Sequence, residues 1–337
     1  MLRALVVNAS AKCYNLGAEK LHVWLQQQGY EVTRVNGDPG IFSYGYALVA
    51  VSVIFSWHAP IARDLVNRVK HESEVWVGGP GLFALQKWFI KETGIAPHVG
   101  VDERFDKVRG TFKMAFASRG CPVGCWFCIV PKLEGKDFTL DWDFQPAPIL
   151  CDNNLSGLPV GFQEHIIASY KGAGVALKDA NSGFEPRSFD EDSYQRWRHL
   201  LEGPWRFAFD EQREREDVLR MLEVLRAERA RRKRVYVLVG NEPYDSCLDR
   251  VRTVIDCGGE PYCQFVLPLN WLGDPADLRP RHDWTYQRGR DFCRYINTFG
   301  YKQFPIEEYR PRLHEDPPFA TTSEPDEAAI AEVAFGT

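Results

Sequence analysis

Three cysteines in one short segment have the residue type and spacing to hold a metal cluster. Between Ser118 and Gly135 the chain reads SRGCPVGCWFCIVPKLEG, in which Cys121, Cys125 and Cys128 are spaced C-x3-C-x2-C. Three thiolates on one loop can bind three irons of a four-iron cluster and leave the fourth iron open to a ligand from a substrate or cofactor. The segment therefore predicts an iron–sulfur site with one open coordination position.

Two other uses of these cysteines stay open. A structural zinc site normally takes four protein ligands in paired spacing, and the sequence has no second pair at a typical distance, although Cys151 is available as a fourth ligand. The other alternative is three buried thiols without a metal, which is an unusual core choice on a loop that contains Gly and Pro. The iron–sulfur site is favoured over both.

Residues 1–100 alternate strand and helix patterns. The nearly continuous apolar runs are typical of buried parallel strands. The expected strands are Leu2–Asn8, Tyr30–Val35, Ala47–Phe55 and Val75–Val77, and the expected helices are Leu16–Gln28, Pro60–Lys70 and Leu82–Thr93. They predict a Rossmann-like, doubly wound α/β domain. The Gly78–Gly81 turn is interpreted as a tight strand-to-helix connection, with phosphate binding as the alternative, because neither a G-x-G-x-x-G nor a P-loop pattern is present.

A second alternation follows a linker at residues 98–112. The expected strands are Phe112–Ala117, Ile149–Cys151, Gly174–Leu177, Trp205–Phe209, Arg234–Val239 and Tyr262–Leu267; the clearest helices are Asp190–Leu201, Arg213–Ala230, Asp245–Cys257 and Trp284–Phe299. Roughly six β–α units over residues 111–310 predict a partial (β/α)6 TIM-type barrel, whose site lies at the C-terminal ends of the strands. The cysteine segment follows the first of these strands. Residues 311–337 are acidic and predicted to be a largely disordered tail.

The cysteine segment resembles the signature of the radical S-adenosylmethionine (SAM) enzymes. Phe127 precedes the last cysteine, as in that superfamily, and the flanking residues 118–120 and 129–132 strengthen the match. The resemblance implies that the three thiolates bind a [4Fe–4S] cluster and that SAM binds the open iron. It further implies cleavage of SAM to methionine and a 5′-deoxyadenosyl radical, which abstracts hydrogen from a substrate. Phe127 is then expected near the adenine.

The resemblance also implies SAM contacts after the next two strands. Asp152 and Asn153 stand where family members often carry Gly-Gly-Glu to receive the SAM amino group. The sequence departs from that pattern here, and an Asx turn is the alternative. Glu185 and Arg187 follow the third expected strand, where a carboxylate accepts ribose hydroxyls and a guanidinium pairs with a carboxylate. A surface ion pair is the alternative reading of these two.

Other polar residues and cysteines have less specific interpretations. Asp210 and Asn241 stand just past expected strands and either face the site or cap the following helices. The cysteines in the last third of the chain form no compact C-x2-C pair and are interpreted as buried free thiols. They are Cys247, Cys257, Cys263 and Cys293.

The N-terminal domain resembles the B12-binding-like domain that precedes the barrel in one branch of the superfamily. Cobalamin-binding versions commonly carry Asp-x-His-x-x-Gly after the first strand, whereas residues 8–17 of this chain contain no histidine. His58 follows another strand and is interpreted as structural or exposed. Cobalamin is therefore not expected, and binding without a protein ligand to cobalt is the alternative.

Composition limits where the protein acts and on what. The 337 residues carry a net charge of −5, which gives no overall attraction to nucleic acid or anionic membrane. No apolar run has the eighteen or so residues of a membrane helix, and an odd number of cysteines, nine, argues against a secreted disulfide framework. These features predict a cytoplasmic protein that does not bind membranes.

The expected substrate is a nucleoside, a nucleotide or another small molecule, and the expected partner is an electron donor such as flavodoxin or ferredoxin. The alternative reaction is a methyl- or methylthio-type modification of a nucleic-acid base. The non-enzyme alternative is a zinc-stabilised binding protein that uses its α/β domain for recognition.

Overall fold

The computed structural model describes residues 1–309. No helix in this range is long and apolar enough to cross a membrane. The predicted tail at residues 311–337 lies outside the described residues.

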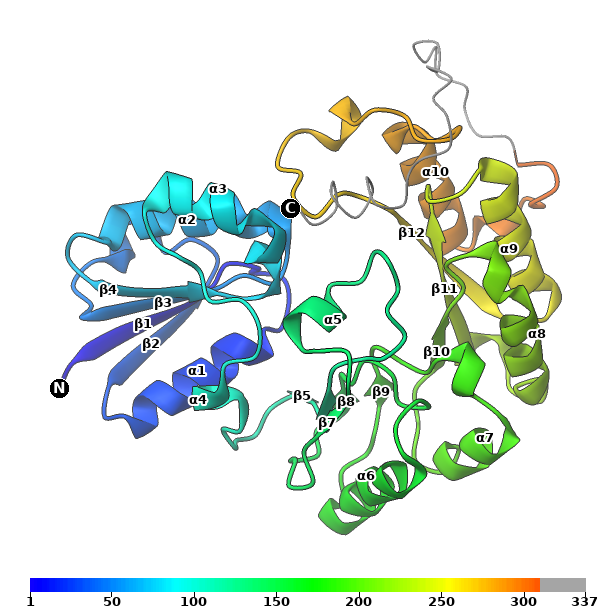
Figure 1. The fold of residues 1–337 in the computed structure, drawn as a ribbon, viewed down its shortest axis with the longest axis horizontal. Helices are drawn as coiled ribbons and strands as arrows, with labels where there is room; N and C mark the ends of the chain where they lie inside the picture. Colours follow the sequence, from blue (N-terminus) through cyan, green and yellow to red (C-terminus); the bar gives the residue numbers. More distant parts are fainter. Residues whose placement is uncertain (310–337) are drawn as a thin grey trace.

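The first hundred residues form a four-stranded parallel sheet of order β2-β1-β3-β4. Its elements are β1 (Arg3–Asn8), α1 (Leu16–Gln27), β2 (Glu31–Asn36), β3 (Leu48–Ser52), α2 (Ala59–Val69), β4 (Glu74–Gly78) and α3 (Gln86–Thr93). The inner strands are apolar on both faces because α1 packs on one face and α2 and α3 pack on the other (Figure 1). The strand order reverses between β1 and β3, and the carboxyl ends of the strands point toward the rest of the chain. Ligands of such sheets bind at that edge.

Six further strands form two three-stranded parallel sheets, of order β5-β8-β9 and β10-β11-β12. Their bounds are β5 (Met114–Ala115), β8 (Ile149–Leu150), β9 (Asp179–Ala180), β10 (Trp205–Ala208), β11 (Lys233–Val239) and β12 (Glu260–Phe265). Backbone contacts connect the two sheets: Leu177 pairs with Leu201 as an isolated parallel bridge, and the Phe184 N–H donates to the Arg206 carbonyl oxygen at 2.8 Å. The strands of this part therefore follow one another in space as they do in sequence.

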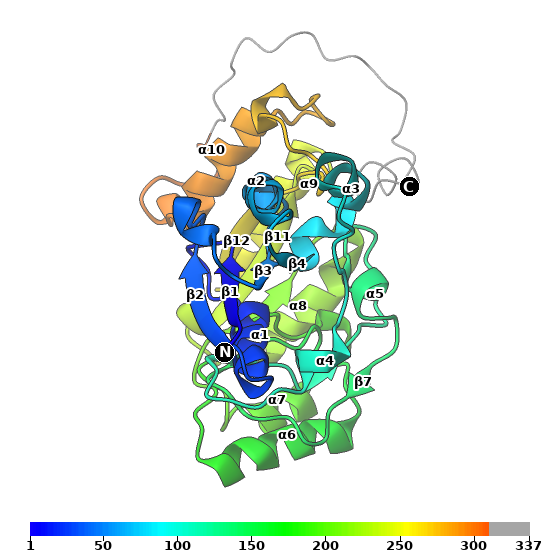
Figure 2. The ribbon, with the colours of Figure 1, turned by 90° about the vertical axis from the view of Figure 1, so that its left-hand side faces the viewer.

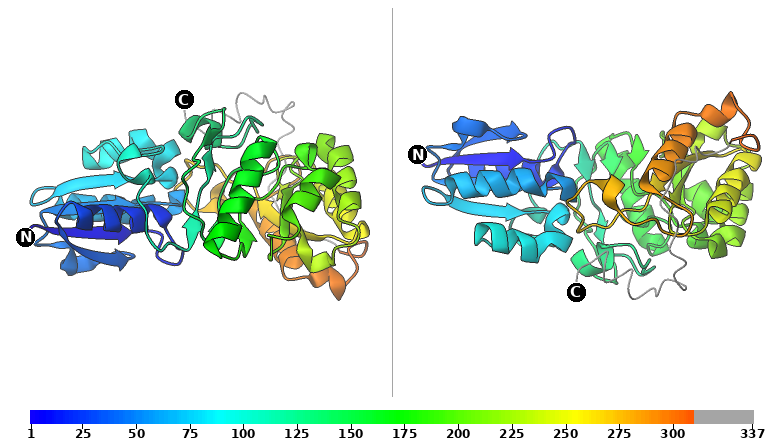
Figure 3. Two further views of the ribbon diagram at one scale, coloured as in Figure 1. Left: turned by 90° about the horizontal axis from the view of Figure 1, so that it is seen from below. Right: turned by 90° about the horizontal axis from the view of Figure 1, so that it is seen from above.

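The helices of the second part enclose one large apolar core with these strands. They are α6 (Val160–Ala173), α7 (Glu191–Trp197), α8 (Arg215–Val224), α9 (Tyr244–Asp256) and α10 (Tyr286–Asn297). Figure 3 shows the N-terminal domain and this second part side by side, and Figure 2 views the molecule with the N-terminal domain in front. The chain between them passes through the four-residue helix α4 (Glu103–Asp106).

Two predicted elements of the second part are wrong in their limits. The third strand was expected at Gly174–Leu177, but α6 runs to Ala173 and Gly174 ends it in the left-handed conformation at φ +63°, so the strand is β9 at Asp179–Ala180. The helix expected at Arg213–Ala230 ends at Val224. The basic run after it forms a separate turn, in which Arg232 Nη2 donates to the Leu201 carbonyl oxygen at 3.1 Å.

Candidate functional site

A small antiparallel hairpin closes the cysteine loop. Strand β6 (Ser118–Arg119) pairs with β7 (Thr139–Leu140), and the residues between them carry all three cysteines and the one-turn helix α5 (Val130–Leu133). Gly120 opens the loop at φ +83°, and a Cβ there would lie 2.1 Å from the Asp137 carbonyl oxygen. Only glycine fits at this position. The loop therefore leaves and re-enters the fold at one point, just after β5.

The three loop thiols are free and partly buried. Burial raises the pKa of each thiol, that of Cys125 to about 12. Against burial, the backbone N–H of Val123 donates to the Cys121 sulfur and that of Val130 donates to the Cys128 sulfur, and each bond lowers the pKa of the thiol it reaches. Hydrogen bonds to sulfur stabilise a thiolate and are among the features that set the potential of a bound cluster.

The donor set fits an iron–sulfur cluster better than a single metal ion. Within residues 1–309 no three His, Cys, Asp or Glu side chains are grouped to hold one ion, so Cys151 is not brought to the loop as a fourth zinc ligand. In a [4Fe–4S] cluster each thiolate binds a different iron, and the three sulfurs do not have to meet at one point. Three thiols on a short hairpin loop with N–H donors match that requirement.

Glu134 fastens the two ends of the cysteine loop. Its Oε2 accepts from the Gly120 N–H at 3.1 Å and from Asn153 Nδ2 at 2.7 Å, while its Oε1 accepts from Arg119 Nη1 at 3.2 Å. Asn153 Nδ2 also lies 3.3 Å from the Gly120 carbonyl oxygen. The predicted SAM contact Asn153 is thus placed at the foot of the loop, and its amide nitrogen is engaged there.

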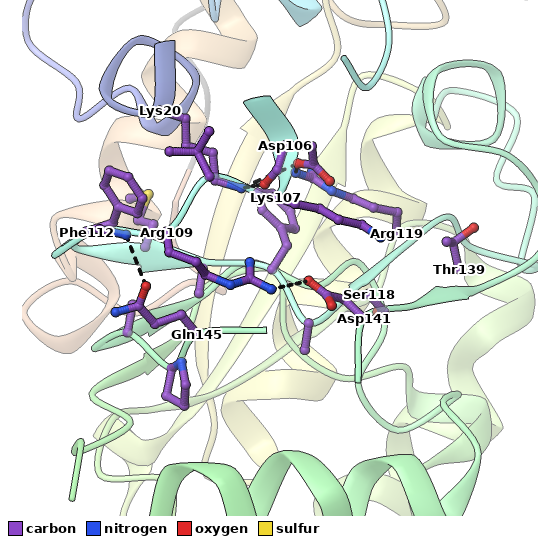
Figure 4. A pocket seen from close by; sticks show the side chains of 18 of the residues that line it. Lys20, Asp106, Lys107, Arg109, Phe112, Ser118, Arg119, Thr139, Asp141 and Gln145 are labelled. Atoms are coloured by element: carbon purple, nitrogen blue, oxygen red, sulfur yellow. Dashed lines mark hydrogen bonds and ion pairs between the residues drawn. The ribbon is translucent and has the colours of Figure 1, made fainter. Parts of the chain in front are cut away.

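An ion-pair chain ties this foot to the N-terminal domain. In Figure 4, Lys20 of α1 meets Asp106 of α4, which in turn pairs with Arg119 at 2.7 Å. These residues line a cleft of about 90 Å³. Burial lowers the pKa of Lys20, and the two cations hold the pKa of Asp106 below its usual value despite burial. The cysteine loop is therefore supported from both parts of the chain.

The Asp152 side chain is held inside the fold, and its predicted role as a SAM contact stays a prediction. It is fully buried, and its carboxylate accepts from the Ala117 N–H at 2.9 Å and from the Ser118 hydroxyl at 2.5 Å. In this arrangement its carboxylate is used within the fold. It does not form an Asx turn within its own loop; it joins the end of β8 to the start of the hairpin.

We expect Asp152 to lower the stability of the protein as pH rises from about 4 to 6. Burial raises its folded-state pKa to about 6, above an unfolded value of about 3.9, so the folded protein binds more protons between these values. The free energy of unfolding then falls with pH, by at most about 1.4 kcal/mol per unit. Chemical denaturation of the wild type and Asp152→Asn checks this. The free energy of unfolding of the wild type relative to that of Asp152→Asn should fall as pH rises. A difference between the two that does not change with pH would contradict the prediction.

Glu185 and Arg187 form an ion pair beside the cysteine loop. Arg187 Nε donates to Glu185 Oε1 at 2.6 Å, and both charges act on the pKa of Cys121 and of Cys125. Arg187 Nη2 lies 3.9 Å from Glu214, and its side chain is 45% exposed. The ion pair read from the sequence is therefore present, and it stands where a molecule bound at the loop would meet it.

Asp210 brings a second carboxyl group to the loop. It follows β10, and its charge acts on the pKa of both Cys125 and Cys128. Burial, and then the neighbouring charge of Glu214, raise the pKa of Asp210 to about 7. Asn241, at the end of β11, donates from Nδ2 to the Asp210 carbonyl oxygen at 2.6 Å. The sequence left two interpretations of Asp210, which either faces the site or caps the following helix. This geometry favours the first.

The aromatic residues of the loop pack against one another. Phe127 meets Trp126 edge-on, with ring centroids 5.3 Å apart. Arg281, from the far end of the chain, lies over the Trp126 ring. The sequence does not reveal this contact, because Arg281 stands in an irregular segment with no motif around it.

The carboxyl edge of the N-terminal sheet borders a cavity of about 760 Å³. Gly17, Ser52 and Gly79 line it from the N-terminal domain, and Arg119 and Glu134 line it from the foot of the cysteine loop. Gly79 has φ +110°, and a Cβ there would lie 2.4 Å from the Val53 carbonyl oxygen. The glycine turn is therefore a tight backbone connection, as expected from the sequence, and it also forms part of a cavity wall.

Hydrogen-bonded side chains occupy the place of the missing cobalamin motif. Asn15 Nδ2 donates to Asn8 Oδ1 and to Ser52 Oγ, each at 3.0 Å. His58 Nδ1 lies 3.0 Å from Ser10 Oγ, and burial lowers its pKa. His58 is thus bound within the domain, as a structural histidine would be.

Comparison with known proteins places the fold. No protein-family model matches the chain, and no curated protein matches it. A solved structure does: the radical S-adenosylmethionine methyltransferase TsrM from Kitasatospora setae, with cobalamin and a [4Fe–4S] cluster bound. The TM-score is 0.59 at 13% sequence identity, over 82% of this chain and 78% of that chain. The fold of this chain is therefore similar to that of this radical SAM methyltransferase.

The similarity of fold includes both parts of the chain, because a match over 82% of its length cannot be confined to one of them. The α/β class with parallel sheets, predicted from the sequence, is confirmed at this level.

Proposed function

We propose that this protein is a radical SAM enzyme. The observation that carries the proposal is the closed hairpin loop with three free cysteines spaced C-x3-C-x2-C in a chain with this fold. We further propose that the six strands of the two three-stranded sheets, β5-β8-β9 and β10-β11-β12, form a partial (β/α)6 barrel over residues 111–310, after a Rossmann-like domain at residues 1–100. The cysteine loop then follows the first barrel strand, at the C-terminal end where barrel enzymes place their sites.

Each group at the loop has a task in this proposal. Cys121, Cys125 and Cys128 hold a [4Fe–4S] cluster, which together with bound SAM supplies a 5′-deoxyadenosyl radical for hydrogen abstraction. Glu185 accepts from the ribose hydroxyls and Arg187 pairs with the SAM carboxylate, since both stand beside the loop. Phe127 packs near the adenine.

The proposed substrate is a nucleoside, a nucleotide or another small molecule, and the proposed electron donor is a flavodoxin or a ferredoxin in the cytoplasm. Methyl transfer is a second candidate reaction, because the structural neighbour is named as a methyltransferase.

The cavity at the N-terminal sheet supports a corrinoid as a second cofactor, against the expectation from the sequence that cobalamin is absent. It offers about 760 Å³ at the sheet edge where such folds bind ligands, and the structural neighbour holds cobalamin. Because His58 is engaged with Ser10, we propose binding without His58 as a ligand to cobalt.

Anaerobic reconstitution with iron and sulfide tests the enzyme proposal. We expect a brown protein with about four irons and four sulfides per chain, which releases 5′-deoxyadenosine when it is reduced in the presence of SAM. A colourless protein that holds one zinc after the same treatment would support the zinc-stabilised binding protein instead.

Cobalamin retention is measured separately. We expect the wild type to keep about one hydroxocobalamin per chain through gel filtration, and Val101→Trp, which fills the cavity, to keep roughly tenfold less. Val101 lines the cavity, whereas Val160 is 52% exposed at the start of α6, so Val160→Trp is the matched control. A wild type that retains no cobalamin would end the corrinoid proposal and leave the cluster proposal standing.

A further inference from the structure

The chain between β12 and α10 reaches from the N-terminal domain to the end of β11. Residues 266–285 contain one short 3-10 turn, Pro275–Asp277. Leu272 packs against the core of the N-terminal domain. Further along, buried Trp284 donates from Nε1 to the Glu242 carbonyl oxygen, just past β11, at 2.9 Å. Figure 1 shows this segment, in orange, crossing above the cysteine loop and α5.

Residues 281–284 form a tight turn that is held in place from several sides. The Arg281 N–H donates to the Trp284 carbonyl oxygen at 3.0 Å, and the Trp284 N–H donates to the Arg281 carbonyl oxygen at 2.9 Å. His282, inside the turn, has φ +52°, and its Nε2 lies 3.0 Å from the Asn241 carbonyl oxygen. A left-handed conformation is unfavourable for histidine and persists where the surroundings fix it, often at functional sites.

This turn presents Arg281 to the cysteine loop without a partner for its charge. The guanidinium carbon lies 5.6 Å from the ring centroid of Trp126, the residue that follows Cys125. Among the described residues no carboxylate pairs with it, its Nε is buried without a hydrogen-bond partner, and burial alone lowers its pKa. In contrast, Arg187 beside the loop is paired with Glu185, and Arg119 at its foot is paired with Asp106 and Glu134.

A half-buried guanidinium loses hydration that a tryptophan face restores only in part. Its planar set of N–H donors matches the oxygens of a carboxylate or a phosphate. The position of Arg281, fixed by the turn and against Trp126 of the cysteine loop, is therefore suited to an anionic group of a bound molecule.

We propose that Arg281 binds a carboxylate or phosphate group of a molecule that occupies the site beside the cysteine loop. The identity of that molecule rests on the proposed function: the anion belongs either to the substrate or to the SAM carboxylate. The contact that places Arg281 is with the Trp126 ring, so anion binding by Arg281 is tested separately from the cluster.

Inorganic phosphate is the probe for the first test, with the full chain before reconstitution. Tryptophan fluorescence and calorimetry should show saturable binding that Arg281→Gln weakens by about tenfold or more, while Arg281→Lys keeps part of it. The control is Arg279→Gln, since Arg279 is exposed two residues away. Phosphate binding that is equal in Arg281→Gln and wild type, with both folded by circular dichroism, overturns the proposal.

The second test identifies the source of the anion, using the reconstituted protein. If Arg281 pairs with the SAM carboxylate, Arg281→Gln should weaken SAM binding about tenfold or more and leave the binding of decarboxylated SAM unchanged. If SAM binding is unchanged in Arg281→Gln, the anion is a substrate group. A protein that binds phosphate through Arg281 but takes up no iron would refute the proposed function alone.

Discussion

Cys125→Ala is expected to abolish iron binding and SAM cleavage together. In the proposed cluster one of the four irons already lacks a protein ligand. Removal of one of the three thiolates would leave only two protein ligands for the whole cluster. Loss of groups that only support a metal ligand commonly costs about 10- to 100-fold, so loss of the ligand itself should exceed about a hundredfold. Iron and sulfide analysis, the visible absorption spectrum and 5′-deoxyadenosine release after anaerobic reconstitution are the measurements.

Cys257→Ala is the matched control for this substitution. Cys257 is a free, partly buried thiol like Cys125, but it ends α9 and its pKa responds to Asp256 and Lys233 and not to the loop. Its replacement should leave the brown colour and SAM cleavage at wild-type levels. If Cys125→Ala kept a full complement of iron, the assignment of the cysteine loop as the cluster site would be withdrawn.

The elements that the sequence predicts well are those whose signal is local. Strands β1, β3 and β11 are apolar enough for their position and type to be read directly, and so are the amphipathic helices α2 and α9. The cysteine spacing likewise lies within one segment. These features need no knowledge of the partner elements, because burial on both faces of a strand is visible in composition.

The features that the sequence does not reveal depend on distant partners. Strands β6 and β7 have two residues each, too few for any periodicity, although they close the cysteine loop. Asp152 is predicted as a SAM contact because it stands where radical SAM family members often carry Gly-Gly-Glu. Its burial follows from the donors of Ala117 and Ser118, which only the folded chain brings to it. Which polar residues near the site face a ligand and which hold the fold together is therefore decided by the tertiary structure.

Arg250 shows the same dependence with a larger expected effect. It lies in α9, whose polar residues are expected to face solvent, yet its side chain has no exposed surface. Its Nη1 donates to the carbonyl oxygens of Phe209 at 2.7 Å and Asp210 at 2.8 Å. Its Nη2 lies 3.2 Å from Asn241 Oδ1. One buried guanidinium therefore joins the carboxyl end of β10 to that of β11, where the proposed site lies.

We expect Arg250→Leu to lower the free energy of unfolding by about 3–5 kcal/mol. The substitution removes the side-chain donor of the Phe209 carbonyl and leaves the Asp210 carbonyl with Asn241 Nδ2 as its side-chain donor. It also removes the cation beside Glu242, whose carboxylate lies 3.2 Å from Arg250. Denaturant unfolding of the full chain measures the loss. Arg226→Leu is the control: that arginine is 76% exposed and pairs at the surface with Glu223, so its change should stay below about 1 kcal/mol.

The same substitution should also affect the proposed chemistry at temperatures where the variant is still folded. Asp210 acts on the pKa of Cys125 and Cys128 from the strand end that Arg250 holds. Without the guanidinium, the Asp210 and Asn241 backbones are free to shift away from the loop, and SAM cleavage should fall in the folded variant while iron content stays near that of the wild type. A free energy of unfolding equal to that of the wild type would show that Arg250 does not hold these strand ends together. Unchanged SAM cleavage in the folded variant would show that the reaction does not depend on the position of these strand ends.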